Sequence, residues 1–331
     1  MHKLAIASLP LLVTAGAFAQ GGVVPPWMAN SPGSGTTNYP FGLGTACRVQ
    51  YEYDAATTGM VAPNLFTMFQ VRSAHGVANT AKANIVLQIE MSATPTTRAT
   101  LSATFANNRG PNHTVVYAQR PTSMPATAVS ITGTLATPFV LDAPFLYDPT
   151  AGDSLLVEFD VASQPSGTWA IDTAWSAAGV HFTLGTACSS MTATSSGGLI
   201  GGALTFTTGG APANAAGAAL LGFTEFPVPI PVPGNPTCSL FHTIDASAAV
   251  VTSATGAASL PLTVPSNNAL KGASIYGQFA AIDPSFLIFT SPARRVFLTA
   301  PDDCGRVYNL TSNTSLTGTV QGYVAPVLAI Q

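Results

Sequence analysis

The stretch Asn84-Ile85-Val86-Leu87-Gln88-Ile89-Glu90-Met91-Ser92 decides the fold class of this chain. Its apolar residues Ile85, Leu87, Ile89 and Met91 occupy alternate positions, and mostly polar residues stand between them. A period of two is that of a β-strand, in which successive side chains point to opposite faces. We expect one face of this strand to lie on a core and the other to lie in water.

The same alternation occurs over residues 48–54 and 155–161. It places Glu52, Glu90 and Glu158 on the solvent faces of their strands. Turn signals such as Asn107-Asn108-Arg109-Gly110-Pro111 separate the strands at short intervals, and 26 Pro and 30 Gly disfavour helices. The sequence therefore predicts an all-β protein built from antiparallel β-sandwiches or jelly rolls.

A repeated motif indicates how the chain is divided. The pattern Phe-x-Leu-Gly-Thr-Ala-Cys occurs at Phe41 to Cys47 and again at Phe182 to Cys188. The two copies are separated by about one domain length. We expect two β-sandwich modules, at residues 41–179 and 180–331, after a lead-in at residues 20–40 that is rich in Gly, Pro and Asn.

The first nineteen residues have the pattern of an export signal. A short basic start precedes the apolar run from Leu4 to Phe18, and Ala17-Phe18-Ala19 matches the small-x-small pattern that signal peptidase cleaves. We expect the mature chain to begin at Gln20 and to be secreted or held at the cell surface. No later stretch is long and apolar enough to span a bilayer.

Composition excludes several classes of function. Only 8% of the residues are charged, against about 25% in an average soluble domain, and 47% are apolar. This combination excludes a disordered chain, because disorder requires low hydrophobicity and high charge. Nucleic acid is excluded as a partner, because the formal net charge is −3 and no basic stripe is present.

The cysteine count predicts disulfides. An exported chain with the four cysteines Cys47, Cys188, Cys238 and Cys304 is expected to form two disulfides, although spacing alone does not decide the pairing. Of the three connectivities, we favour Cys188–Cys238 within the second module and Cys47–Cys304 joining the ends. No Cys-x-x-Cys or Cys-x-x-His spacing supports a metal site.

No motif for catalysis is present. The chain lacks Gly-x-Ser-x-Gly and His-Glu-x-x-His, and its few acids disfavour a glycosidase. His75, His113, His181 and His242 could each act as a base, but none has a carboxylate at a useful local spacing. A hydrolase with a Ser/His/Asp site assembled from distant loops remains open. We predict no cofactor.

Two sets of residues are weak candidates for binding sites, and each set also has a purely structural interpretation. Trp169 and Trp175, with Tyr147, could stack on a sugar, although core packing is the commoner role of such residues. Asp148, Asp153 and Asp160 are weak calcium candidates, although the run from Asp148 to Asp153 has the composition of a turn.

One segment is unusual in its prolines. The run Phe226-Pro227-Val228-Pro229-Ile230-Pro231-Val232-Pro233 has proline at every second position. Such a segment must be an edge strand, a polyproline stretch or a connection, because proline cannot donate to a sheet ladder. It is a candidate docking strip, or an edge that is protected against aggregation.

The chain resembles a large group of secreted β-rich proteins that planctomycetes and related bacteria encode in quantity. The residues that carry the resemblance are Arg48 to Asp54, Met91 to Pro95, Thr104 to Asn108, Thr114 to Tyr117, Pro144 to Asp153, Leu184 to Cys188, Gly234 to Leu240, Leu260 to Pro265, Leu270 to Gln278 and Asp283-Pro284. The resemblance implies a secreted β-rich fold and implies no activity. Cys47 departs from the first-half pattern.

These observations predict an exported, non-catalytic structural or interaction protein. Its expected partners are extracellular matrix or cell-envelope components, among them polysaccharide or further copies of the chain. A carbohydrate-binding module and a secreted hydrolase with a scattered site are the alternatives.

Overall fold

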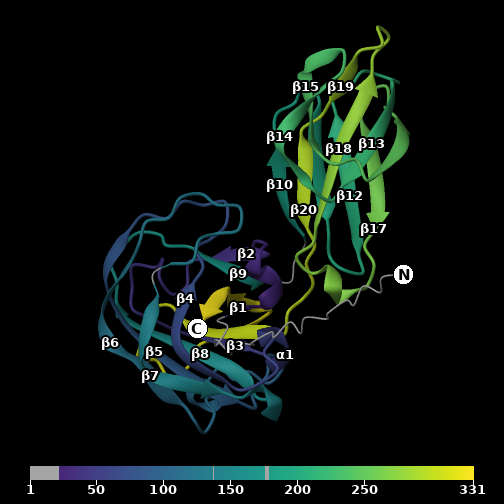
Figure 1. Ribbon diagram of the computed structural model, residues 1–331. Helices are drawn as coiled ribbons and strands as arrows, with labels where there is room; N and C mark the ends of the chain where they lie inside the picture. The colour runs from purple at the N-terminus through teal and green to yellow at the C-terminus, as the bar shows by residue number, and fades with distance from the viewer. Residues whose placement is uncertain (1–21, 137, 176–178) are drawn as a thin grey trace, which may run out of the picture.

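The computed structural model describes residues 22–136, 138–175 and 179–331. The predicted export signal, residues 1–19, lies outside them. Antiparallel sheets dominate the described residues, with a few short helices (Figure 1), so the predicted all-β class is confirmed. Among the described residues, no helix combines the length and the apolarity that a membrane crossing requires.

Three sheets make up the lower lobe of Figure 1, which we call the first lobe. The largest has the order β22 (Thr319–Gly322), β21 (Cys304–Asn309), β3 (Cys47–Tyr53), β8 (Ser154–Ser163), β5 (Lys82–Thr94), β6 (Thr114–Met124). The second is β1 (Gly22–Val24), β24 (Leu328–Ile330), β4 (Asn64–Val71), β7 (Phe139–Tyr147), and the third is β2 (Gly35–Thr37), β9 (Ile171–Trp175), β23 (Val324–Pro326). Its short helices are η1 (Pro26–Ala29), α1 (Ala55–Thr58), η2 (Phe105–Asn108) and η3 (Pro149–Ala151).

The upper lobe of Figure 1, which we call the inserted lobe, contains the strands between β9 and β21. Its main sheet has the order β10 (Val180–Leu184), β20 (Ala293–Phe297), β18 (Ser274–Ile282), β13 (Ala216–Gly222), β16 (Ala246–Val251), and β19 (Ile288–Thr290) pairs with β18. A smaller sheet is β11 (Thr192–Gly197), β12 (Ala203–Gly209), β17 (Ala258–Thr263), beside the hairpin β14 (Glu225–Val232), β15 (Asn235–His242) and η4 (Asn268–Leu270).

The sheet order differs from the predicted division at residue 180. Strand β21 pairs with β3, with Cys304 opposite Tyr53, and β24 pairs with β4. The last strands of the chain therefore belong to the first lobe. The strands within residues 180–297 pair only with one another, so the second unit ends at β20. The predicted lead-in at residues 20–40 also joins the sheets, because β1 pairs with β24 and β2 pairs with β9.

Each lobe has its own apolar core. In the first lobe, aromatic rings from facing sheets meet edge to face, as do Phe69 of β4 and Phe159 of β8, whose centroids are 5.9 Å apart. Such contacts add to the free energy gained by burying the rings. In the inserted lobe, Phe206 of β12 packs with Phe279 of β18 and Val296 of β20 in a second core.

The second face of the largest sheet is covered, which the sequence did not predict. Glu52, Glu90 and Glu158 were expected in water, yet they are 0%, 6% and 1% exposed. The segment 95–113, which contains η2, lies over this face: Gln50 Nε2 donates to the Phe105 carbonyl at 3.0 Å. Because alternation reports only that a face is polar, it did not show that another segment covers that face.

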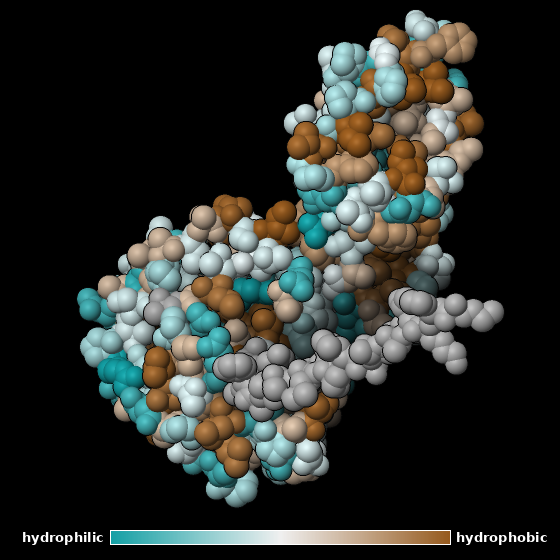
Figure 2. Space-filling view, in the orientation of Figure 1, coloured by the Kyte–Doolittle hydropathy of each residue, from teal (hydrophilic) through white to brown (hydrophobic). Residues whose placement is uncertain are grey.

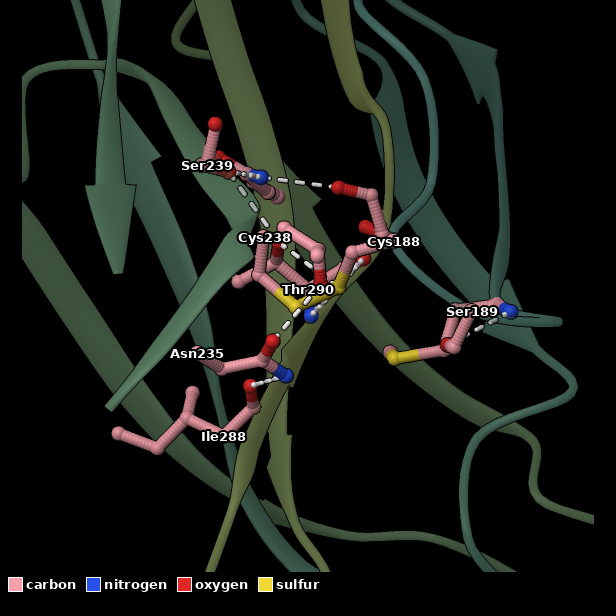
Figure 3. The surroundings of a disulfide bond; sticks show 11 residues. Cys188, Ser189, Asn235, Cys238, Ser239, Ile288 and Thr290 are labelled. Carbon is pink, nitrogen blue, oxygen red and sulfur yellow. Dashed lines mark hydrogen bonds between the residues drawn. A yellow bond between two sulfur atoms is a disulfide. The ribbon is translucent and has the colours of Figure 1, made fainter. Parts of the chain in front are cut away.

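One of the two predicted disulfides is confirmed. Cys188, just after β10, is bonded to Cys238 of β15, and the backbone N–H of Thr290 donates to Cys188 Sγ at 3.2 Å (Figure 3). The disulfide and this hydrogen bond together connect the segment after β10 to β15 and β19. The disulfide constrains a loop of 50 residues in the unfolded chain.

The predicted Cys47–Cys304 disulfide is wrong. Both cysteines are free and buried. They cannot bond to each other because they lie at opposite ends of the β3–β21 pair. Cys304 faces Tyr53, at the far end of β3 from Cys47, which corresponds to roughly 20 Å along the strand. The Cα atoms of a disulfide cannot be more than about 7 Å apart.

We therefore predict that two cysteine thiols react slowly with Ellman's reagent in the native protein. Denatured, unreduced protein should release two equivalents of thionitrobenzoate from Ellman's reagent, since two cysteines are free. The native protein should react only at the rate of unfolding, because both thiols are buried. Protein reduced before denaturation serves as the reference for all four cysteines, and a denatured protein with no reactive thiol would contradict this assignment.

Candidate functional site

The structure places two of the three aromatic candidates in the first core. Trp169 and Tyr147 are both 0% exposed, and their polar atoms bond to the backbone: Trp169 Nε1 donates to the Pro125 carbonyl at 2.9 Å. Neither ring offers a face to a polysaccharide. Trp175 pairs with Val324 through its backbone, and its side chain lies outside what the structure describes.

The three calcium candidates do not converge. Asp148 caps η3 by accepting hydrogen bonds from the N–H and the hydroxyl of Thr150, as a turn aspartate does. Asp153 directly precedes β8, and Asp160 lies within that strand, roughly 20 Å further along it. Asp160 instead accepts a hydrogen bond from Asn313 Nδ2 at 2.8 Å.

His75 has an aspartate partner and His181 has a serine partner, but the two pairs do not belong to one Ser/His/Asp triad. His75 Nδ1 lies 2.7 Å from Asp172 Oδ1, and His181 Nδ1 lies 2.8 Å from Ser195 Oγ. Phe182 contacts the His75 ring, and adjacent residues of a strand point to opposite faces. His181 therefore points away from His75, and the described residues assemble no Ser/His/Asp triad from these pairs.

A cluster of charged side chains occupies the covered face of the largest sheet. We define the Glu158 cluster as Arg48, Gln50, Glu90, Arg109, His113 and Glu158. Glu158 accepts hydrogen bonds from Arg48 Nε, Gln50 Nε2 and both Nε and Nη2 of Arg109. These four bonds satisfy both carboxylate oxygens, so the charge is compensated although it is buried.

Glu90 forms the second half of the cluster. It accepts from Arg109 Nη2 at 2.6 Å and from Gln88 Nε2, and His113 Nε2 lies 2.6 Å from its Oε2. Burial acts to raise the pKa of Glu90, but the hydrogen bond to His113 and the charge of Arg109 outweigh it, so that pKa is lowered. The residues come from β5 and from the covering segment, and their sequence spacing gave no signal of this contact.

Three side chains of the cluster are of types that bind metal ions. Glu90, His113 and Glu158 each present one ligand atom within 4.8 Å of the others. The Arg109 guanidinium, however, lies 2.6 Å from Glu90 and 2.9 Å from Glu158. A second cation would have to displace it. The carboxylate oxygens of Glu90 and Glu158 are therefore occupied by the Arg109 guanidinium, and the cluster is an internal ion network.

Glu52 is a buried acid without such partners. Its side chain is 0% exposed, and within the described structure neither carboxylate oxygen has a hydrogen-bond partner. Burial is the largest contribution to its pKa shift, and the pKa of Glu52 is raised to about 8. At neutral pH the folded protein therefore keeps this carboxyl mostly protonated.

Exposed apolar side chains of the inserted lobe include Phe286 at its end and Val228 of β14. Figure 2 shows apolar side chains spread over this lobe. Phe286 is 87% exposed at the tip of the β18–β19 hairpin, and Val228 of β14 is 72% exposed. The β14–β15 turn reaches the same hairpin, because Asn235 Nδ2 donates to the Ile288 carbonyl at 3.0 Å.

Comparison with known proteins gives no family. No family model matches the chain, and no curated protein matches it. A β-glucuronidase of Bacteroides uniformis matches 84% of this chain and 26% of its own, at 9% identity and a TM-score of 0.14. Bacteroides uniformis β-glucuronidase 2, bound to cyclophellitol-6-carboxylate aziridine, has the same coverage and identity and a TM-score of 0.13. A lamprey immune protein has 7% identity over 80% of this chain and 100% of its own, with a TM-score of 0.07.

The chain spans about a quarter of the length of the two β-glucuronidases. At TM-scores this low the similarities support no inference about fold or function.

Removing one charge from the cluster should be costly. We expect Glu158→Gln to lower the free energy of unfolding by about 3–5 kcal/mol, because Arg48 loses its counter-charge at a buried site and Arg109 keeps only Glu90. Urea denaturation followed by tryptophan fluorescence measures this loss. Glu225→Gln is the control: it breaks the more exposed Arg295 pair and should cost less than about 1 kcal/mol. Equal losses would contradict a special role for the cluster.

Glu52 should make stability depend on pH. Between pH 4.5 and about 8 the unfolded chain releases the Glu52 proton and the folded protein retains it. The contribution of Glu52 to stability is therefore full below pH 4.5 and declines as the pH rises, by up to about 1.4 kcal/mol per unit.

The variant Glu52→Gln lacks this titration. The free energy of unfolding of the variant minus that of the wild type should therefore increase steadily as the pH rises through this range. Urea denaturation at several pH values measures this difference. Parallel curves for Glu52→Gln and the wild type would contradict a raised Glu52 pKa.

Proposed function

We propose that the protein is an exported, non-catalytic structural protein of the extracellular or cell-surface space. It acts by contacting other molecules, first of all further copies of the same chain. The apolar end of the inserted lobe provides the contact. Three features support this proposal: the geometry of the hairpin tip, the low surface charge and the disposition of the candidate catalytic groups.

The hairpin tip is the observation that carries the proposal. Asp283 Oδ1 accepts from the N–H groups of Ser285 and Leu287, and the Phe286 N–H donates to the Asp283 carbonyl. Phe286 has a φ of +63°, a conformation that is costly for a bulky residue. The tip thus holds a large ring outward, where burial against a partner would recover about 1.5–3 kcal/mol.

The charge distribution supports contact between copies. With 8% charged residues and a formal net charge of −3, identical molecules repel one another weakly. Many of the charges are also directed inward, as in the Glu158 cluster and the buried Arg72–Asp172 pair. The outer surface is therefore mainly uncharged polar and apolar, and such a surface associates readily at moderate salt.

The alternatives receive less support from the described residues. A hydrolase would need one histidine with both a serine and a carboxylate, and here Asp172 and Ser195 serve different histidines. A carbohydrate module would need exposed aromatic faces, and Trp169 and Tyr147 are buried.

The test is sedimentation velocity of residues 20–331 over a wide concentration range. We expect reversible association, weakened about tenfold or more by Phe286→Ser, since about 1.4 kcal/mol of contact energy corresponds to one order of magnitude. Val61→Ser is the control, because Val61 is 90% exposed but lies in the first lobe. A monomer at every concentration that pellets with an insoluble polysaccharide would overturn the proposal in favour of carbohydrate binding.

A further inference from the structure

Three reactive side chains are buried together in the first lobe and have no part in the function proposed above. They are Lys82 at the start of β5, Gln164 just after β8 and Cys47 at the start of β3. Lys82 is 5% exposed, Gln164 is 8% exposed and Cys47 is 0% exposed. The three strands are neighbours in the largest sheet, which brings the side chains to one end of it.

A backbone irregularity turns Lys82 inward. The pairing of β5 with β6 shifts register between Lys82 and Ile85, and Asn84 between them has a φ of +58°. Without the shift, Lys82 and Ile85 would point to opposite faces, because their separation is odd. With it, both side chains are buried.

Lys82 is held by oxygen atoms and by no carboxylate. Its Nζ donates to the Phe41 carbonyl at 2.6 Å, to Gln164 Oε1 at 2.8 Å and to the Gly167 carbonyl at 3.0 Å. No ion pair among the described residues includes it. Burial lowers the pKa of Lys82, which makes the neutral, nucleophilic amine more accessible than at the surface.

The amide of Gln164 is held by hydrogen bonds at both its oxygen and its nitrogen. Its oxygen accepts from Lys82, and its Nε2 donates to the carbonyls of Pro40 at 2.7 Å and Thr45 at 3.0 Å. The Gln164 side chain is therefore fixed, and Lys82 Nζ is in hydrogen-bond contact with the carbonyl group that it would attack. This arrangement supplies the proximity that an intramolecular reaction requires, in a site with little access to water.

We propose that Lys82 and Gln164 become joined by an isopeptide bond after folding. The Lys82 ammonium first loses one proton to solvent, which frees the lone pair of Nζ. The neutral Nζ then attacks Cδ of Gln164, the Nζ–Cδ bond forms and the Cδ–Nε2 bond breaks. One Nζ proton passes to the leaving nitrogen, which departs as ammonia. No oxidant or other reactant is consumed. The product connects the start of β5 to the end of β8 by a covalent side-chain link.

The neighbouring thiol is a less suitable nucleophile. Cys47 Sγ lies 3.8 Å from Gln164 Nε2, but burial raises the pKa of Cys47 to about 12. The thiolate, which is the reactive form, is therefore scarce. Cys47 is buried beside Gln164, and the lysine provides the nucleophile.

The test is intact-mass spectrometry of full-length exported protein beside the variant Lys82→Arg. Relative to its sequence mass, the wild type should lack one ammonia more than the variant. The variant is the reference because an N-terminal glutamine also loses ammonia when it cyclises. Lys271→Arg is the matched control, since Lys271 is the other lysine of the mature sequence, and it should keep the ammonia deficit of the wild type.

Tryptic mapping of the wild type gives a second readout that does not depend on the variant folding. Cleavage after Lys82 should be absent, and the peptides that contain Lys82 and Gln164 should appear as one branched species. Normal cleavage after Lys82, with no ammonia lost beyond the N-terminal one, would overturn the proposal. Lys82 would then be a structural ammonium held by its three oxygen acceptors.

Discussion

The carboxylate of Glu158 is the contact on which the first lobe depends. It lies near the middle of the largest sheet, on the face opposite the aromatic core, and accepts four hydrogen bonds from Arg48, Gln50 and Arg109. Arg48 and Gln50 belong to the sheet, and Arg109 belongs to the segment that covers it. The ion network therefore attaches the cover to the sheet, and with the cover in place Glu52, Glu90 and Glu158 on the covered face are buried.

The same use of charge recurs at the junction of the lobes and beneath the lead-in segment. Asp172 is fully buried and binds Arg72, His75 and the backbone N–H of Gly33. Asp302 accepts hydrogen bonds from Trp27 Nε1 of the first lobe and from Lys271 Nζ of the inserted lobe. Several of the few charged residues of this chain thus form internal contacts, and most side chains at its surface are uncharged. Glu52, whose carboxylate has no hydrogen-bond partner among the described residues, is the exception.

The chain topology explains how the inserted lobe is presented. Residues 180–297 leave the first lobe after β9 and return to it at β21, so the insertion is anchored at both ends. Figure 1 shows that the β18–β19 tip lies at the end of this lobe that is remote from the first lobe. A contact made there leaves the first lobe and its covered sheet undisturbed. The proposed Lys82–Gln164 link lies in the first lobe, where it would strengthen the part that bears the insertion.

The sequence by itself determined the strand class, because the period-two alternation of Ile85, Leu87, Ile89 and Met91 is a local property of the backbone. It also led to the Cys188–Cys238 pair. Only the tertiary structure decided what lies over a polar face, which is why Glu52, Glu90 and Glu158 are buried and not in water. It also separated Cys47 from Cys304 and gave Asp172 and Ser195 to different histidines. These outcomes depend on which distant segments pair, and pairing is set by the burial of the whole chain, which local alternation does not encode.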